Sequence, residues 1–484
     1  MPKSKKSRPT LARHIPRDDP PYAHLVRSNN QPLDSEVDEI RLIIQDAKKS
    51  LAEQANGFRP EAREESKALR ALIKTCTKII HPVRRLPFEI ISEIFLQTLS
   101  GPHDWDDYPE VHDYDRGPWA YSKVCRRWRD VALQSPRLWS ELSVPSNCGS
   151  YWLHVENPIG RLKLWLHRSR SAPLRILYGG LGKHGPKEHD TITSLLFEQS
   201  ERWEVFRWIG CSDPGRFQRL GEVVGRVPLL RHLDVQHFIA GCSQEATTAV
   251  PFASLVALQP HLVRFHAERF LVDPFKLLDI APNLEDLALV LNPAHDDIPR
   301  KWFPLSRLTH SGIQRLVINE PYMVALPYLV FPQLKCLGLR SFALDDLHLI
   351  AELISRSRCT LKKLVVQGKY RFQLSLDVVL QANPILEELT LVGDESMPHL
   401  PALKAFSCDV TGVDPNALVT MLESRCERGH LRKVTLWSAQ TPVKKWVNVK
   451  LLRRVKDLGK KGVQVVVADI PWSYYSLKMQ DSME

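Results

Sequence analysis

The sequence contains little glycine and none of the cysteine pairs that build zinc sites. Glycine accounts for 22 of 484 residues, against an average of about 7%, so glycine-rich phosphate-binding loops are disfavoured. The nine cysteines are odd in number, and no two of them are spaced as Cys-x-x-Cys. This pattern is typical of reduced thiols in a cytoplasmic or nuclear protein, and not of a disulfide framework.

Long apolar runs and catalytic motifs are missing as well. No run of about 18 apolar residues predicts a membrane span, and Met1–Thr10 lacks the apolar core of a secretory signal. The segment 179–184 departs from a phosphate-binding loop, because Leu177 and His184 stand where Gly and Ser or Thr are needed. His184 and His189 have no matching zinc ligands in the sequence. We therefore expect a protein that is not an enzyme and has no cofactor, no metal and no membrane partner.

The formal net charge of +11 comes from two segments. Residues 1–27 carry seven Lys or Arg and two Asp, and residues 425–461 carry twelve Lys or Arg and two acidic residues. The rest of the chain is slightly acidic, which disfavours nucleic acid as a general partner. An acidic partner is instead expected at a local patch formed by Lys444, Lys445, Arg453, Arg454, Lys460 and Lys461.

The N-terminal third predicts a tail followed by helices. Residues 1–32 are polar and rich in proline, which is typical of a disordered basic tail. Within 33–82, apolar residues recur in steps of three and four over 33–51 and again over 69–80. This spacing predicts two helices packed as a coiled-coil-like hairpin, with self-association of the seam as the alternative.

Residues 83–144 contain three motifs in a fixed order. Leu86-Pro87-Phe88-Glu89-Ile90 opens a helix that continues through Ile94-Phe95, because proline is favoured at a helix start. An acidic stretch follows, and then Val124-Cys125-Arg126-Arg127-Trp128-Arg129 on a helix expected over 122–133. Pro136-Arg137-Leu138-Trp139 completes the set.

This order of motifs resembles an F-box, and with the preceding hairpin it is similar to large fungal F-box families. The loop between Leu96 and Trp119 is longer and more acidic than is usual in that family. The resemblance implies an all-α module that inserts into a hydrophobic groove of a Skp-type adaptor. The residues that match its contact positions are Leu86, Pro87, Ile90, Ile94, Val124, Cys125 and Trp128. Ile91, Phe95, Val131 and Leu138 are expected to form the small core of the module.

Residues 150–470 repeat the pattern Leu-x-x-Leu-x-Leu. Seven clear copies begin at residues 230, 284, 313, 334, 361, 386 and 431, and three weaker copies begin at 203, 262 and 403. Most spacings are close to the roughly 20–29 residues of leucine-rich repeats, a family that the region resembles. The last two anchors lie on one face of a short strand, so the units are expected to stack.

The prediction is therefore an α/β chain with a helical hairpin, an all-α F-box and an irregular leucine-rich-repeat solenoid. A non-repeat α/β domain is the alternative for 150–470. Only the copy ending at Asn292 has the asparagine typical of such repeats. Asp286, Ala288 and Val290 are expected on the concave face, a final strand over 463–467 is expected to close the array, and 471–484 is a C-terminal tail.

The resemblance implies a substrate-recognition adaptor of a Skp–cullin–F-box ubiquitin ligase. The F-box would bind the Skp-type adaptor and through it a cullin, and the repeats would bind a target protein. Ubiquitin transfer would then depend on proximity, with no nucleophile from this chain. The alternatives are a repeat protein that binds nucleic acid or another acidic partner, and an F-box scaffold that acts outside a ligase.

Overall fold

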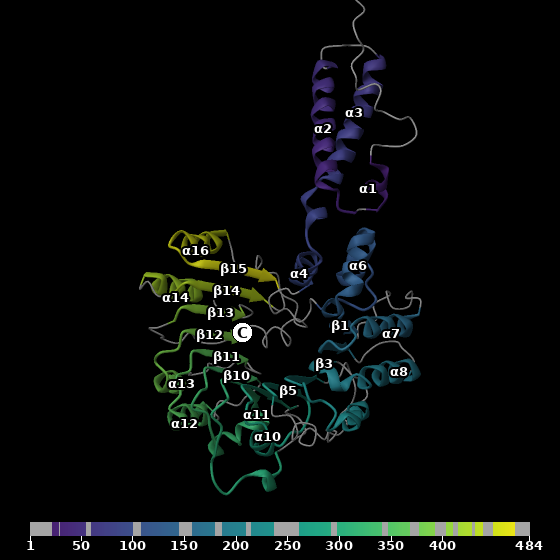
Figure 1. Cartoon of the computed structure of the whole chain (residues 1–484). Helices are drawn as coiled ribbons and strands as arrows, with labels where there is room; N and C mark the ends of the chain where they lie inside the picture. Colours follow the sequence, from purple (N-terminus) through teal and green to yellow (C-terminus); the bar gives the residue numbers. More distant parts are fainter. Residues whose placement is uncertain are drawn as a thin grey trace, which may run out of the picture. The chain divides into compact units, whose positions relative to one another are not determined.

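The structure is a computed structural model of the whole chain, shown in Figure 1. The residues that it describes are 22–28, 30–54, 60–99, 108–144, 157–179, 186–209, 214–236, 261–291, 298–340, 347–367, 377–392, 403–409, 415–427, 431–438 and 449–469. They divide into two compact units. The first contains the described residues of Met1–Pro102, Pro109–Ser140 and Leu164–Arg170, and the second contains the remainder.

The first unit is built from helices. In chain order they are α1 (Ala23–Ser28), α2 (Asp34–Gln54), α3 (Pro60–Ile79), η2 (Pro82–Arg85), α4 (Phe88–Leu99), α5 (Gly117–Val124), α6 (Arg126–Gln134) and η4 (Pro136–Trp139). The Leu164–Arg170 segment of this unit includes the end of α7 (Pro158–Arg168).

Helices α2 and α3 pack side by side along the apolar seam of the sequence (Figure 1). Ile40, Cys76 and Ile79 have no exposed surface and belong to one apolar cluster. Leu25 of α1 is buried in the same cluster, so the prediction of a disordered tail through residue 32 is wrong for 23–28. A short helix forms there because Leu25 contributes to the hairpin core.

Three tryptophans, from α5, η4 and α7, pack together in the first unit. The rings of Trp119 and Trp139, and those of Trp139 and Trp165, lie edge to face with centroids 5.0 Å apart. The Arg168 guanidinium lies 4.8 Å from the centroid of the Trp119 ring and 4.6 Å from that of Trp139. Such cation–π contacts are strongest where water is excluded.

The predicted domain boundary near residues 144–150 is incomplete, because Leu164–Arg170 also belongs to the helical unit.

The second unit contains a 13-stranded sheet among the described residues, and its strand pairings are parallel. Its strands, in spatial order, are β1 (Glu141–Val144), β2 (Leu174–Gly179), β3 (Trp203–Ile209), β4 (His232–Gln236), β5 (Arg264–Glu268), β6 (Asp286–Val290), β8 (Arg315–Asn319), β10 (Cys336–Arg340), β11 (Lys363–Gln367), β12 (Glu388–Val392), β13 (Ala405–Asp409), β14 (Lys433–Ser438) and β15 (Gln464–Asp469). Within this sheet, spatial order follows chain order, so each strand pairs with the preceding strand of the same sheet. The chain is thus mixed α/β with a large parallel sheet, as the sequence predicted.

Each of the ten predicted repeat copies coincides with a strand of this sheet. On β6 and β8, for example, Leu287 lies opposite Leu316 and Leu289 lies opposite Ile318. All four side chains are at most 3% exposed. The apolar anchors therefore form continuous rows on one face of the sheet, because each strand is in register with the next.

Helices and short 3₁₀ turns connect the strands along the chain. They are α8 (Pro186–Phe197), η6 (Ser200–Arg202), η7 (Pro214–Val223), α10 (Pro274–Ile280), η8 (Arg300–Trp302), α11 (Glu320–Met323), η9 (Leu326–Tyr328), α12 (Leu347–Ser357), α13 (Asp377–Ala382), α14 (Pro415–Glu427) and α16 (Val449–Lys460). In Figure 1, α12, α13, α14 and α16 lie on the same side of strands β11–β15.

The sequence did not predict β1, β2 or the separate two-stranded sheet of β7 (Leu308–Thr309) and β9 (Leu329–Val330). It also placed the expected asparagine at Asn292, which lies outside the described residues. A buried asparagine does occur one strand further on. The Asn319 side chain accepts a hydrogen bond from the Leu291 N–H at 3.0 Å and donates one to the Leu291 carbonyl at 2.6 Å.

Candidate functional site

Helix α4 has two apolar faces, and only one of them is buried within the first unit. Ile91 and Phe95 are 2% and 1% exposed, as expected for the core of the module. Ile90 and Ile94 are 48% and 45% exposed. They are four residues apart and therefore lie on the same side of the helix. The result is an apolar strip that faces away from the core.

The predicted helix over 122–133 is broken at Cys125, which corrects the sequence expectation. The backbone of Cys125 is extended, so α5 ends at Val124 and α6 begins at Arg126. The Cys125 thiol caps α6 by accepting a hydrogen bond from the Trp128 N–H at 3.5 Å. The half-buried thiol thus stabilises a helix start, as polar N-cap side chains do. Val124, at the end of α5, is 60% exposed.

Trp128 is half-buried because part of its ring packs within the first unit. Its centroid lies 4.8 Å from that of Phe95, with the rings edge to face. Phe95 in turn stacks on Tyr121 at 4.3 Å. Of the seven predicted contact residues, Pro87, Ile90, Ile94 and Val124 are exposed, and Leu86, Cys125 and Trp128 are half-buried.

Arg127 was not singled out in the sequence, although it holds the Leu86-Pro87 segment in place. Its guanidinium donates hydrogen bonds to the carbonyl oxygens of Arg84 and Leu86. Arg84 donates to the Leu25 carbonyl at 2.7 Å, and burial lowers the pKa of its guanidinium. No local pattern reveals such contacts, because they join residues more than 40 positions apart. They fix the turn before α4 against α6.

The face of the sheet opposite the apolar rows carries a chain of buried charges. Arg207 on β3 lies in register with Asp234 on β4, and Asp234 lies in register with His266 on β5. The Arg207 Nε atom is 2.7 Å from Asp234 Oδ2. His266 Nδ1 lies 3.9 Å from the same carboxylate oxygen, and His266 Nε2 lies 3.1 Å from Oδ1 of Asp286.

Asp286 is the point where this chain meets two further arginines. Its Oδ2 atom is 2.9 Å from Arg264 Nε and 3.2 Å from Arg315 Nη1. Burial raises the pKa of the Asp286 carboxyl, but its interactions with His266, Arg315 and Arg264 outweigh burial and lower the pKa to about 2. Burial, followed by the charges of Arg264 and Arg175, lowers the pKa of neighbouring His232 to about 4.

These pairs change the interpretation of the concave face. Asp286 and Ala288 were expected on a recognition surface, but they are 6% and 2% exposed, and Val290 is half-buried. Glu268 on β5 reaches Arg340 on β10 at 3.1 Å, so oppositely charged side chains pair across the intervening strands. Charges buried in this way are normally paired. The residues of this row of buried charges therefore stabilise the sheet and are not presented to a ligand.

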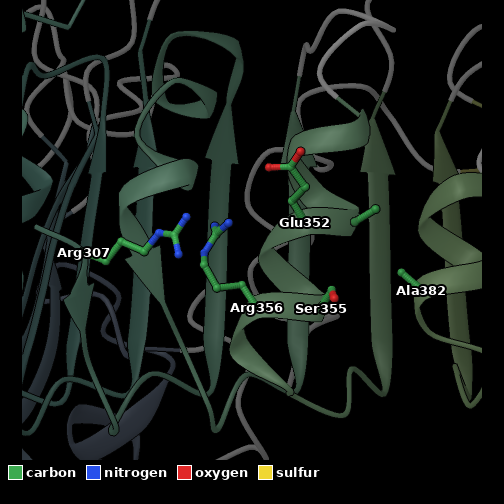
Figure 2. A pocket seen from close by; sticks show the side chains of 6 residues that line it. Arg307, Glu352, Ser355, Arg356 and Ala382 are labelled. Atoms are coloured by element: carbon green, nitrogen blue, oxygen red, sulfur yellow. The ribbon is translucent and has the colours of Figure 1, made fainter.

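An open hollow of about 480 Å³ lies on the helical side of the second unit. Figure 2 shows the side chains of Arg307 and Arg356 directed toward one another, with Ser355 and Ala382 farther along the wall. Arg356 donates to the carbonyls of Leu329 and Leu326 at 3.2 and 2.7 Å. Burial, together with the charge of Arg307, lowers the pKa of Arg356. Glu352 also lines the hollow, and its carboxylate offsets part of the positive charge of the two arginines.

The predicted acidic-partner patch is only partly present. Lys444 and Lys445 lie outside the described residues. Arg454 forms an ion pair with Glu423 at 2.6 Å, and Lys460 pairs with Asp457 at 2.7 Å, so their charges are partly compensated. Arg453 and Lys461 are exposed.

His189 is buried in a polar cluster with Tyr178 and Thr193, and His184 lies outside the described residues. His189 is 6% exposed and lies 3.0 Å from the Tyr178 hydroxyl, which also contacts Thr193 at 2.9 Å. Within the described parts of the chain, no three His, Cys, Asp or Glu side chains are grouped to hold a metal ion. Likewise, none of the described helices is both long and apolar enough to cross a membrane.

Comparison with known proteins adds no assignment. No protein-family model matches the sequence, and no curated protein matches it.

Proposed function

We propose that this chain is a substrate-recognition adaptor of a Skp–cullin–F-box ubiquitin ligase. The supporting observation is the division of apolar residues in the first unit. Ile91 and Phe95 fill its core, while Ile90, Ile94 and Val124 are about half exposed or more. The F-box resemblance assigns these exposed residues to the adaptor contact.

The exposed apolar strip is consistent with binding to a hydrophobic groove. Burial of apolar surface contributes roughly 25 cal/mol per Å². A half-exposed isoleucine or valine therefore has on the order of 1 kcal/mol to gain from a partner. Hydrogen bonds from Arg127 hold the preceding Leu86 turn against α6, which reduces the ordering cost of binding.

The second unit would supply target recognition in this proposal. A ligase adaptor needs no nucleophile, because it raises the local concentration of the target next to the ubiquitin carrier. The buried charge chain of β3–β8 is occupied by its own pairing. Target binding is thus assigned to the exposed edges and helical side of the sheet.

The test uses charged substitutions at exposed positions, so that the core is not disturbed. Ile94→Asp combined with Val124→Asp is expected to weaken binding of a purified Skp-type adaptor at least 100-fold, measured by calorimetry. We avoid Trp128→Ala because Trp128 packs on Phe95. The matched control is Val378→Asp with Ile385→Asp in the second unit, where both side chains are 49% exposed.

The control variant should bind the adaptor as the unchanged chain does. Equal affinity of the Ile94/Val124 variant and the unchanged chain, with unaltered circular dichroism, would show that this surface is not the docking site. Co-purification with the adaptor but without a cullin would instead favour a scaffold that acts outside a ligase.

A further inference from the structure

Exposed cations lie along one edge of the parallel sheet, where successive strands begin. The residue just before strand β10 is Lys335, before β11 Lys362, before β13 Lys404 and before β14 Arg432. Lys433, the first residue of β14, adds a fifth exposed cation. We call these five residues the entry edge.

Backbone hydrogen bonds show that the entry edge is continuous. The Lys362 N–H donates to the Lys335 carbonyl at 2.7 Å, and the Glu387 N–H donates to the Lys362 carbonyl at 2.9 Å. The Lys404 N–H then donates to Glu387, and the Arg432 N–H donates to Lys404, both at 2.7 Å. Adjacent strands are about 4.8 Å apart, so the row from Lys335 to Arg432 spans roughly 19 Å.

Glu387 divides this row into two basic groups. Its carboxylate lies 2.8 Å from Lys404 Nζ, and that interaction lowers the pKa of Glu387. Lys335 and Lys362 remain on one side of the division, and Arg432 and Lys433 on the other. The centres of the two groups are about 17 Å apart at the strand spacing.

We propose that the entry edge binds an extended acidic protein segment with two clusters of carboxylates. An extended chain rises about 3.3 Å per residue, so two clusters centred about five residues apart match the two basic groups. A uniformly charged polyphosphate fits less well, because Glu387 would repel it near the middle. The row also contains no aromatic side chain, and single-stranded nucleic acid is usually held by stacking on aromatic rings.

This surface differs from the patch expected at residues 444–461, and it does not depend on the adaptor role of the first unit. The net charge of the sequence could not reveal the entry edge, because Lys335 and Arg432 are almost 100 residues apart. The parallel register brings them onto one edge.

The experiment measures binding of the full chain to a fluorescent peptide by anisotropy. The probe carries two blocks of three glutamates separated by two serines. Affinity should fall with added salt, as expected for exposed charge pairs. Lys362→Glu combined with Arg432→Glu should reduce affinity at least about tenfold, since attraction becomes repulsion in both basic groups.

The matched control is Lys48→Glu with Lys49→Glu on α2, which changes net charge equally at two exposed positions. It should bind the peptide as the unchanged chain does. An equal loss in both variants would indicate a nonspecific charge effect and overturn the proposal. Tighter binding of an oligothymidine of equal charge than of the peptide would overturn the assignment to a protein segment.

The same variants separate this proposal from the adaptor proposal. Lys362→Glu with Arg432→Glu should leave binding of the Skp-type adaptor unchanged. Loss of peptide binding with retained adaptor binding supports the entry edge alone, and the Ile94/Val124 variant should show the converse.

Discussion

Replacing Asp286 by Asn removes one negative charge from the row of buried charges on the sheet, while the shape of the side chain hardly changes. Two half-buried arginines and the buried His266 then lose their shared anion. The substitution should destabilise strands β5, β6 and β8, since a buried charge that loses its partner is strongly unfavourable. The paired charges of this face hold the strands together, but well-packed apolar side chains in place of the whole set would give a similar free energy of unfolding.

Two estimates give the size of the effect. The pKa of Asp286 falls from its ordinary value of 3.8 to about 2, and each pKa unit corresponds to about 1.4 kcal/mol. The charged carboxylate therefore contributes about 2 kcal/mol at neutral pH. Removing one partner of a buried ion pair typically destabilises by roughly 3–5 kcal/mol. The expected loss is about 2–5 kcal/mol.

Hydrogen exchange by mass spectrometry is the suitable assay, because a chain with two compact units need not unfold in one step. Exchange in peptides covering β5, β6 and β8 reports the local opening free energy. Glu388→Gln is the control. Glu388 occupies the same register row on β12 and pairs with Lys363 at 3.3 Å, but its side chain is 46% exposed. Its loss should be below about 1 kcal/mol.

The pH dependence gives a second check. A carboxyl whose pKa is lowered by folding adds stability above its unfolded pKa and loses it as the pH falls toward the folded value. Protection of β6 in the unchanged chain should therefore decline between about pH 4 and pH 2. If Asp286→Asn and Glu388→Gln weaken protection equally, the buried charge chain does not stabilise the sheet as argued.

Two further predictions concern the same sheet. The pKa of His232 is about 4 in the fold, so protonation favours the unfolded chain, and the free energy of unfolding should drop by up to about 3 kcal/mol as the pH falls from 6.5 to 4. In thermal melts, His232→Gln should show a smaller drop over this pH range than the unchanged chain, and an equal drop would contradict the assignment. Asn319→Ala removes two hydrogen bonds to the Leu291 backbone and leaves buried polar groups unpaired, so the urea midpoint should fall by the equivalent of about 3 kcal/mol. A decrease below about 1 kcal/mol would indicate that water replaces the amide.

The strands were predictable from the sequence because their apolar anchors repeat with one internal spacing. Every copy of Leu-x-x-Leu-x-Leu places its last two anchors two residues apart, and only a strand puts such residues on one face. Strand β2 has the same alternation at Leu174, Ile176 and Tyr178, but Leu174 follows a turn without the earlier anchor. The repeat pattern therefore did not predict β2.

The exposed and buried sides of α4 were also accessible to sequence reasoning. Ile90-Ile91 and Ile94-Phe95 are two adjacent pairs four residues apart, so a helix must turn one member of each pair away from the core. The break at Cys125 was not accessible. No proline or glycine lies within 122–133 to mark an interruption of the helix.

The roles of charged residues on the sheet depend on position within the strand, which composition cannot show. Asp286 and Arg315 begin their strands, and parallel pairing places them side by side on the face opposite the leucines, where Asp286 is buried and Arg315 is half-buried. Lys362 and Arg432 lie one residue earlier than that row, and they are exposed. For Lys362 and Arg432, a shift of a single residue along the chain thus separates exposed charges from the charges of Asp286 and Arg315, which pair between strands. The distinction follows from the register of strands that are distant in sequence, so the net charge of +11 carried no information about it.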